Sequence, residues 1–316
     1  RVVRAWRPDV LWSTYPIATA HLIGGALHRR SGLPWIADFR DPMAQEGYPA
    51  DPDVWQSFKR VEEDALRNAR CSVFTTPGAA RVYRERYPEF ARRVEVIENG
   101  YDEESFAGCD RRSAPREPLN PAAITLLHSG IVYPSERDPT QLFAALAQLL
   151  ESGALRRNEL RVRFRAAAHD VMLADLARRY DVESMIELLP PIAYRAALGE
   201  MLRADALLVL QASNCNEQIP AKLYEYLRAG RPILALTDPD GDTAAVMREA
   251  GLGDIAPLDR VDRIAERLAQ FLSALRSGSA ATPEARWVAG ASRRARAREL
   301  SNLLDVSLDA DRRSAT

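Results

Sequence analysis

The sequence predicts an α/β protein built on parallel sheets, because apolar strands alternate with helical segments. Residues 207–210 form an uninterrupted apolar run, which is typical of a strand buried on both faces of a parallel sheet. A helical segment with Pro220 at its first position ends at Gly230, and residues 233–236 form a second apolar strand. Near the amino end, the same order of strand, helix and strand recurs at residues 10–12, 17–30 and 33–37. Two strands joined by a helix are most simply parallel, so we expect a parallel sheet in each half of the chain.

Periodicity and turn residues predict the other elements. In the first half we expect helices at residues 54–68 and 78–87 and a strand at residues 71–75. In the second half we expect strands at residues 123–127, 161–165 and 186–189, and helices at residues 194–202, 261–275 and 286–304. A further helix begins at Pro139, with Asp138 as its cap. Residues 107–121 are polar and rich in Arg and Pro without periodicity, which is typical of a linker.

Composition bounds the class of protein. The 316 residues are 47% hydrophobic, enough for two domains with cores, and the net charge of −1 gives no reason to expect a nucleic-acid partner. Three scattered cysteines fit a reducing cytoplasm rather than a disulfide framework. No apolar run approaches the roughly 20 residues that span a bilayer. The chain begins at Arg1, so we expect that upstream residues are missing.

The chemistry is expected where the strand at residues 207–210 gives way to the helix. Lys222 lies in the first helical turn, where backbone N–H groups lack partners and the helix dipole is positive. An ammonium group beside free N–H groups suits an anion such as a diphosphate. Glu225 shares the helix face of Lys222, about 4.5 Å further along, and could accept hydrogen bonds from the two hydroxyls of a ribose.

The alternative interpretation is a solvated Lys–Glu pair on a surface helix, which is common and weak. Two observations favour the site. The helix follows a buried strand at its carboxyl end, where open α/β sheets bind ligands. Lys222 and Lys59 are the only lysines in a chain that otherwise uses Arg, which suggests that a compact point charge is needed at this position.

At these residues the sequence resembles a known family. Glu217 and Glu225 are separated by seven residues, with Pro220 and Lys222 between them and Gly230 and Pro232 after them. This pattern between two apolar strands resembles the donor site of GT-B glycosyltransferases, particularly glycosyltransferase family 4. The resemblance implies an α/β GT-B fold of two Rossmann-like parallel-sheet domains that face each other across a cleft. It places an acceptor-side domain at residues 1–118, a nucleotide-sugar-binding domain at residues 119–280, and a crossing helix and tail at residues 281–316.

The resemblance also implies site residues. Gly130 and Arg137 lie in the first loop of the second domain, where the family places a glycine and an arginine near the diphosphate. The backbone around Ile192 would hold the nucleobase, and Glu217 would lie near the donor sugar. Further donor contacts are expected from Asn216, Ile219 and Pro220. On the acceptor side, Arg40 and Asp41, beside Asp38, stand at the end of the strand at residues 33–37.

Two features depart from the family or compete with it. Where the family has a glycine turn and a basic residue, this chain has Ala166-Ala167-Ala168-His169, so a second basic phosphate ligand is in doubt. Residues 238–242 contain Asp-x-Asp pairs, which bind a divalent metal in another glycosyltransferase fold, but Pro-Asp-Gly also favours a turn. We favour the turn and expect no metal. The Gly-rich unit that opens the family's first domain is not found before Val10.

The sequence therefore predicts a retaining, metal-independent glycosyltransferase. It would transfer a sugar from a UDP- or GDP-type donor to a glycan or lipid-linked acceptor in cell-surface polysaccharide synthesis. We expect it in the cytoplasm, and peripheral contact with the inner face of a membrane stays open. Two alternatives also remain: a nucleotide-sugar epimerase or phosphorylase on the same fold, and a non-catalytic GT-B-like binding partner. An NAD-dependent enzyme is disfavoured, because no Gly-x-Gly-x-x-Gly follows a strand.

Overall fold

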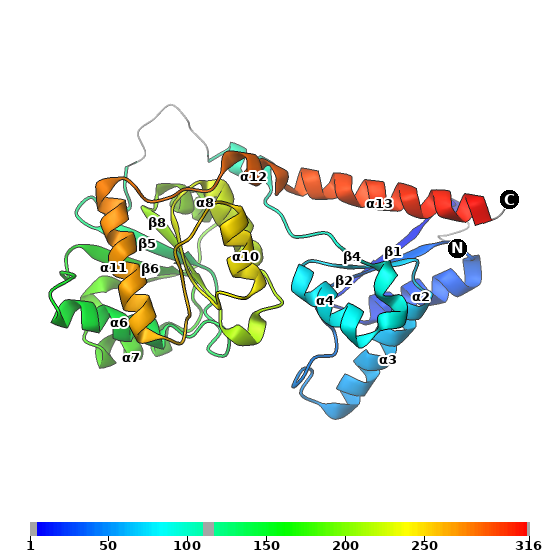
Figure 1. The fold of residues 1–316 in the computed structure, drawn as a ribbon, viewed down its shortest axis with the longest axis horizontal. Helices are drawn as coiled ribbons and strands as arrows, with labels where there is room; N and C mark the ends of the chain where they lie inside the picture. The colour runs from blue at the N-terminus through cyan, green and yellow to red at the C-terminus, as the bar shows by residue number, and fades with distance from the viewer. Residues whose placement is uncertain (1–4, 110–116, 315–316) are drawn as a thin grey trace. The chain divides into compact units, whose positions relative to one another are not determined.

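The computed structural model describes residues 5–109 and 117–314, and the chain divides into two compact units (Figure 1). Unit 1 comprises residues 1–99 and 294–316, and unit 2 comprises residues 100–293. Each unit contains one sheet whose neighbouring strands are all parallel. The predicted α/β class with two Rossmann-like parallel-sheet domains is confirmed.

Unit 1 contains a four-stranded sheet in the order β1-β2-β3-β4. Its elements are β1 (Leu11–Thr14), α2 (Thr19–Ser31), β2 (Trp35–Arg40), α3 (Pro52–Asn68), β3 (Cys71–Phe74), α4 (Pro77–Arg86), the 3₁₀ helix Pro88–Arg93, β4 (Val94–Val96) and α13 (Arg293–Ser314). Side chains alternate along β2: Trp35 and Phe39 pack in the core beside α3 and α4, and Ile36 packs on the opposite face near Leu303 and Leu304 of α13. The sheet is thus covered on both faces.

Helix α2 differs from the pattern that its apolar residues indicate. Ile17, Leu22 and Ile23 are exposed, and the buried residues of α2 are His21, Gly24 and Gly25. The bulk of Trp35 explains the difference. Its fully buried indole lies against Gly24 and Gly25 of α2, which leave room for it because they carry no side chain.

Gly24 provides a test of this close packing. A Cβ atom on Gly24 would lie 2.6 Å from Trp35 Nε1 and 3.0 Å from Ser13 Oγ, two atoms that already share a 2.8 Å hydrogen bond. We expect Gly24→Ala to destabilise unit 1 by about 1–3 kcal/mol through overpacking, and hydrogen exchange of the β1 and β2 amides measures it. Gly199→Ala in α8 (Tyr194–Arg203) is the control, because no described residue outside its own helix lies within 4 Å of its Cβ position. Unchanged β1 and β2 exchange in Gly24→Ala would contradict the packing.

Unit 2 contains a six-stranded sheet in the order β10-β9-β8-β5-β6-β7. Its first elements are α5 (Glu103–Ala107), β5 (Ile124–Ser129), α6 (Thr140–Glu151), β6 (Leu160–Arg165), α7 (Asp170–Arg179), the 3₁₀ helix Glu183–Met185, β7 (Ile186–Leu189) and α8. The remaining elements are β8 (Ala206–Leu210), the 3₁₀ helix Ser213–Cys215, α9 (Ala221–Ala229), β9 (Ile233–Leu236), α10 (Asp242–Glu249), β10 (Ile255–Ala256), α11 (Val261–Ser277) and α12 (Ala285–Gly290). Strand order reverses between β5 and β8, and ligands of open α/β sheets bind at such a switch point.

The unit 2 sheet is packed between two layers of helices, which Figure 1 shows on its two sides. One core cluster joins the sheet to α6, α7 and α11, and includes Phe143, Leu173 and Leu268. A second cluster joins it to α8, α9 and α10, and includes Leu198 and Leu223. Helix α9 therefore lies on the face opposite to α6, and its first turn follows the loop that leaves β8.

Residues near both ends of unit 2 explain its extent. Tyr101 and Phe106 pack in the second core cluster, so the compact unit begins at Gly100, ahead of the predicted linker at residues 107–121. Residues 110–116 of that linker lie outside the described residues, and the predicted bound at residue 118 stays a prediction. The single helix predicted at residues 286–304 is wrong. The backbone of Tyr101 bonds to Ala291 and Arg293, which separates α12 from α13.

Candidate functional site

Unit 2 brings most of the predicted donor-site residues to the carboxyl edge of its sheet. Gly130 and Arg137 lie in the loop after β5, and Glu217 and Lys222 lie in the loop after β8 and the first turn of α9. These are the two loops that diverge at the switch point of the strand order. Arg40 and Asp41 belong to unit 1 and are described separately below.

Lys222 closely approaches the loop after β5. A Cβ atom on Gly130 would lie 2.7 Å from Lys222 Nζ, so only glycine leaves room for the ammonium group here. The φ angle of Gly130 is +121°, a backbone conformation that side chains with a Cβ rarely adopt. On its other side, Lys222 Nζ lies 3.3 Å from Nε2 of His128, the penultimate residue of β5. The amine is therefore held between a glycine and a buried imidazole.

The surroundings of Lys222 make its positive charge costly. Burial and the neighbouring Arg137 guanidinium lower the pKa of Lys222 to about 7, although Glu225 acts in the opposite direction. The guanidinium of Arg137 stacks 5.1 Å from the centre of the Tyr133 ring and donates a 2.9 Å hydrogen bond to the Ile131 carbonyl. Burial and the guanidinium therefore favour the neutral amine, and a bound anion would favour the ammonium form.

Glu225 lies one turn after Lys222 on α9 and accepts a 2.6 Å hydrogen bond from the hydroxyl of Tyr194. Tyr194 is the first residue of α8 and follows Ile192, whose side chain is exposed. Burial and the Glu225 carboxylate raise the pKa of Tyr194, so its hydroxyl remains a donor. The bond links the carboxylate expected to hold the ribose to the loop expected to hold the base.

The other predicted donor contacts surround the start of α9. Ile219 is buried, and Glu217 and Asn216 are partly buried. Pro220 is the cap residue that precedes the helix, which corrects its predicted first helical position, because its ψ angle of 124° is extended. The side-chain nitrogen of Asn216 donates a 2.6 Å hydrogen bond to Asp238, whereas its buried side-chain oxygen has no hydrogen-bond partner among the described residues.

The turn predicted at residues 238–242 is confirmed. The backbone N–H of Gly241 donates to the Asp238 carbonyl at 3.1 Å, and the N–H of Asp240 donates to the Asp238 carboxylate at 3.0 Å. Over residues 5–109 and 117–314, no group of three or more His, Cys, Asp and Glu side chains is placed to hold a metal ion.

The family has a glycine turn in the loop after β6. In this chain the same loop forms a turn with alanine residues in place of glycine. Ala166 and Ala168 have φ angles of 58° and 65°, in the left-handed region. The nearby Arg165 side chain binds the Glu200 carboxylate at 2.7 and 2.8 Å. Its guanidinium is thereby committed to an internal ion pair.

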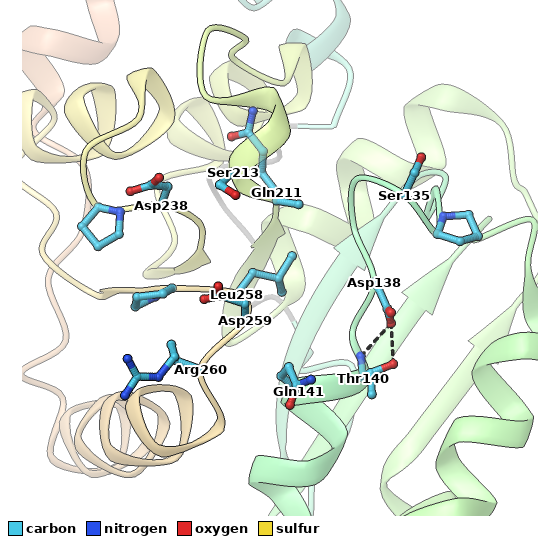
Figure 2. Close-up of a pocket in the computed structure, with 14 residues that line it drawn as sticks. Ser135, Asp138, Thr140, Gln141, Gln211, Ser213, Asp238, Leu258, Asp259 and Arg260 are labelled. Atoms are coloured by element: carbon cyan, nitrogen blue, oxygen red, sulfur yellow. Dashed lines mark hydrogen bonds between the residues drawn. The ribbon is translucent and has the colours of Figure 1, made fainter. Parts of the chain in front are cut away.

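A pocket of about 500 Å³ lies at the same edge of the sheet, on the side of α6 and α11 (Figure 2). None of the predicted site residues lines it. Its walls come from the loops that follow β5, β8, β9 and β10, and include Asp138, Gln211, Asp238 and Arg260. Helix α6 begins at Thr140 and its cap residue is Pro139, so the predicted cap at Asp138 and the predicted start at Pro139 are each one residue early. Asp138 accepts hydrogen bonds from the backbone N–H and the hydroxyl of Thr140.

In unit 1, the end of β2 carries the predicted acceptor-side residues. Arg40 has a φ angle of 58°, and the register between β2 and β3 shifts between Asp38 and Arg40. The Arg40 carbonyl is fixed by two 2.9 Å hydrogen bonds from Thr75. Asp38 accepts a 2.8 Å hydrogen bond from Thr14, and burial raises the pKa of Asp38. A non-glycine residue in this conformation is held there by its surroundings.

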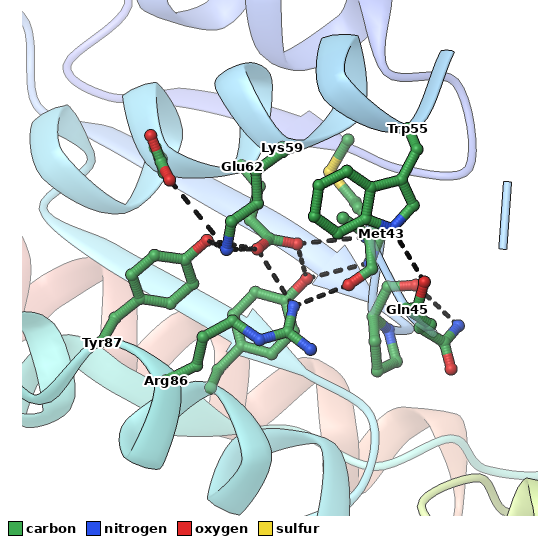
Figure 3. A network of polar contacts seen from close by, with 11 residues as sticks. Met43, Gln45, Trp55, Lys59, Glu62, Arg86 and Tyr87 are labelled. Atoms are coloured by element: carbon green, nitrogen blue, oxygen red, sulfur yellow. Dashed lines mark hydrogen bonds and ion pairs between the residues drawn. The ribbon is translucent and has the colours of Figure 1, made fainter. Parts of the chain in front are cut away.

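A buried polar network holds the loop that follows Asp41 (Figure 3). Its centre is Glu62 of α3, which is fully buried and accepts hydrogen bonds from the hydroxyls of Tyr83 and Tyr87. Arg86 lies 3.2 Å from the Glu62 carboxylate and also donates a 2.7 Å hydrogen bond to the Ala44 carbonyl. The loop is therefore attached to α3 and α4 through one buried carboxylate. Further members of the network are Lys59, the Ala44 N–H and the Met43 N–H, which donates to Tyr83.

Two residues of the unit 2 cluster carry no function in the sequence prediction. His128 is interpreted from the sequence as a packing residue, and Tyr194 only as the start of a helix. Both side chains come from strands or helices distant from Lys222 in the sequence. The only signal for His128 was its place at the carboxyl end of a strand, two residues before Gly130.

The amino-terminal residues match a known family. Residues 1–100 match the family described as glycosyl transferase 4-like domain. The chain is also similar to the D-inositol 3-phosphate glycosyltransferase of Kineococcus radiotolerans, with 30% identity over 214 residues, which are 65% of this chain and 48% of that protein. The chain spans about half the length of the curated relatives it matches, 48% and 50%. The matched domain and these relatives are described as glycosyltransferases, the enzyme class that the sequence predicts.

Solved structures establish the fold. The chain is similar to Anabaena Alr3699/HepE in complex with UDP and glucose, with a TM-score of 0.68, 14% identity, and coverage of 96% of this chain and 80% of that chain. It is also similar to the sucrose-phosphate synthase of Thermosynechococcus elongatus, with a TM-score of 0.67, 15% identity, and coverage of 98% and 76%. The predicted GT-B fold is therefore confirmed. The family match of residues 1–100 confirms the resemblance to glycosyltransferase family 4. Within the described ranges, no helix is long and apolar enough to cross a membrane.

Proposed function

We propose that this chain transfers a sugar from a nucleotide diphosphate donor. The premise is its GT-B fold together with the glycosyl transferase 4-like domain that residues 1–100 match. The acceptor is a glycan or lipid-linked molecule of cell-surface polysaccharide synthesis, and the donor is of the UDP or GDP type. The sugar keeps its anomeric configuration. The observation that carries this proposal is the cluster of Gly130, Arg137 and Lys222 at the start of α9.

The proposed catalytic contribution of this cluster is electrostatic. When the bond between sugar and diphosphate breaks, negative charge builds on the departing phosphate oxygens. Lys222, Arg137 and the N–H dipoles of the first turn of α9 are fixed before the reaction, so they stabilise that charge without reorganising. Because these groups supply the positive charge, the proposal assigns no metal or other cofactor to the reaction.

The donor would extend from this cluster in two directions. Glu225 accepts from the ribose hydroxyls with the carboxylate oxygen that Tyr194 leaves available, and the backbone at Ile192 faces the base. Glu217, Asn216 and Ile219, just before α9, lie beside the sugar. Arg40 and Asp41 of unit 1 contact the acceptor or the sugar. The departing phosphate oxygen takes the acceptor proton, which is the expectation for retention without a protein base.

The first test is calorimetric binding of UDP, GDP, ADP and dTDP without metal. We expect one of them to bind, and Lys222→Ala to weaken that binding by about 1.5–3 kcal/mol, the range for a hydrogen bond to a charged group. This corresponds to roughly 10- to 150-fold in Kd. Arg178→Ala is the control, because it removes an exposed positive charge of unit 2 that is paired with Asp175. Equal losses in both variants, or binding unaffected by Lys222→Ala, would contradict the assigned site.

A further inference from the structure

His128 is fully buried, and its hydrogen bonds define its protonation state. Its Nδ1 atom lies 3.0 Å from the carbonyl oxygen of Leu208 in the neighbouring strand β8. A carbonyl oxygen only accepts hydrogen bonds, so Nδ1 must carry the hydrogen. Complete burial and the charge of Lys222 lower the pKa of His128 well below its usual range, so the ring is neutral. Its Nε2 atom therefore presents a lone pair.

That lone pair faces Lys222. The 3.3 Å contact between His128 Nε2 and Lys222 Nζ is a hydrogen bond that the lysine donates. The charged groups around Lys222 are Arg137 in the loop after β5, which repels its ammonium form, and Glu225 on α9, which favours it. His128 on β5 is the neutral acceptor among them. The amine is thus oriented by an acceptor that adds no negative charge.

We propose that His128 is a positioning residue of the diphosphate site, which holds the Lys222 amine against Gly130 and couples diphosphate binding to the uptake of one proton from solvent. The proposal rests on the function proposed above and specifies how the Lys222 amine of its anion site is oriented before the ligand binds. A carboxylate in place of His128 would neutralise Lys222 and compete with the ligand. A neutral acceptor fixes the direction of the amine and leaves its charge available.

The sign of the proton coupling follows from the two states of Lys222. In the free protein the pKa of Lys222 is about 7, and a bound diphosphate favours the ammonium form and raises it. At any pH between the Lys222 pKa of the free protein and that of the complex, binding transfers a proton from solvent to Lys222 Nζ. We therefore expect affinity to be constant below about pH 7 and to fall above it, by up to about tenfold for each pH unit.

The ligand-free protein allows a direct test, because Lys59 and Lys222 are its only lysines. Lysine labelled with ¹³C and ¹⁵N gives two side-chain signals, and Lys222→Arg assigns them. We expect the Lys222 signal to titrate near pH 7. His128→Leu removes the acceptor and should shift this titration to lower pH, whereas His128→Gln keeps an acceptor oxygen and should restore it. A Lys222 titration that is the same in all three proteins would overturn the positioning role of His128.

The second test measures protons during binding. Calorimetric titrations of the diphosphate at pH 8, in buffers of different ionisation enthalpy, should give an uptake approaching one proton for each molecule bound. Lys222→Arg should bind without uptake, because arginine is charged throughout this range. If wild type and Lys222→Arg take up the same number of protons, the coupling through Lys222 is wrong.

The two tests separate the inference from the function on which it rests. If no diphosphate binds at any pH but the Lys222 titration responds to His128→Leu, the proposed function fails and the positioning role stands. If a diphosphate binds and the titration of Lys222 is unaffected by His128→Leu, the function stands and the positioning role fails. His128→Gln is the control for misfolding of His128→Leu, because it also replaces the imidazole but keeps a hydrogen-bond acceptor.

Discussion

Glu62→Ala is expected to lower the free energy of unfolding of unit 1 by about 3–5 kcal/mol, the range found when one partner of a buried ion pair is removed. The carboxylate of Glu62 is completely buried, and the change would leave Arg86, Lys59 and two tyrosine hydroxyls without their shared acceptor. Tyr83 is fully buried and cannot turn to water. Denaturant unfolding, followed by hydrogen exchange of unit 1 peptides, measures the loss.

The neighbouring Glu63 provides the matched control. It lies on the same helix, with its side chain about half exposed, and its carboxylate lies 4.0 Å from the Lys59 amine. Glu63→Ala should change the stability by less than about 0.5 kcal/mol, as is usual for surface positions. A comparable loss in both variants would mean that helix content, not the buried network, is responsible. A small effect of Glu62→Ala would mean that water reaches the network.

The same network explains a limit of sequence analysis. The amphipathic helix at residues 54–68 was predicted from its apolar spacing, and α3 occupies nearly this range. In the structure Asp51 caps this helix and accepts hydrogen bonds from the N–H groups of Asp53 and Val54. Nothing in that spacing indicates that Glu62 turns inward, because its partners Tyr83 and Arg86 lie on another helix. Local periodicity predicts elements, whereas the partner of a buried charge depends on tertiary packing.

The residues of the donor-side cluster also fall into those that the sequence could predict and those that it could not. Lys222 and Glu225 could be predicted together because both lie on one helix, where spacing alone fixes their relation. Gly130 was predicted only through the family resemblance, because it lies 92 positions before Lys222 in the sequence although the two residues are in contact. His128 and Tyr194 could not be assigned, because their contacts with α9 depend on the order of strands in the sheet. Similarly, Leu22 of α2 is exposed and Gly24 is buried because of where Trp35 packs. The helical period of the sequence carries no information about that packing.

Gly130→Ala should have the largest effect on the proposed donor site, because it combines two penalties. The φ angle of +121° is costly for alanine, on the order of 1–3 kcal/mol. The new methyl group would also lie 2.7 Å from Lys222 Nζ and 3.3 Å from its Cε, so the amine must leave its position between Gly130 and His128. We expect diphosphate affinity to fall at least as much as in Lys222→Ala, and unit 2 to lose stability.

A control and a double-variant cycle separate these two penalties. Gly153→Ala, after α6, also places alanine at a positive φ of +72°, but apart from its chain neighbours no described residue lies within 4 Å of its Cβ position. It should cost stability and leave diphosphate binding unchanged. If Gly130→Ala acts by displacing the amine, adding it to Lys222→Ala should weaken binding little further, because the two changes remove one interaction. Fully additive losses in affinity would instead mean that Gly130 serves the ligand directly, with its backbone against the diphosphate, and that Lys222 binds independently of it.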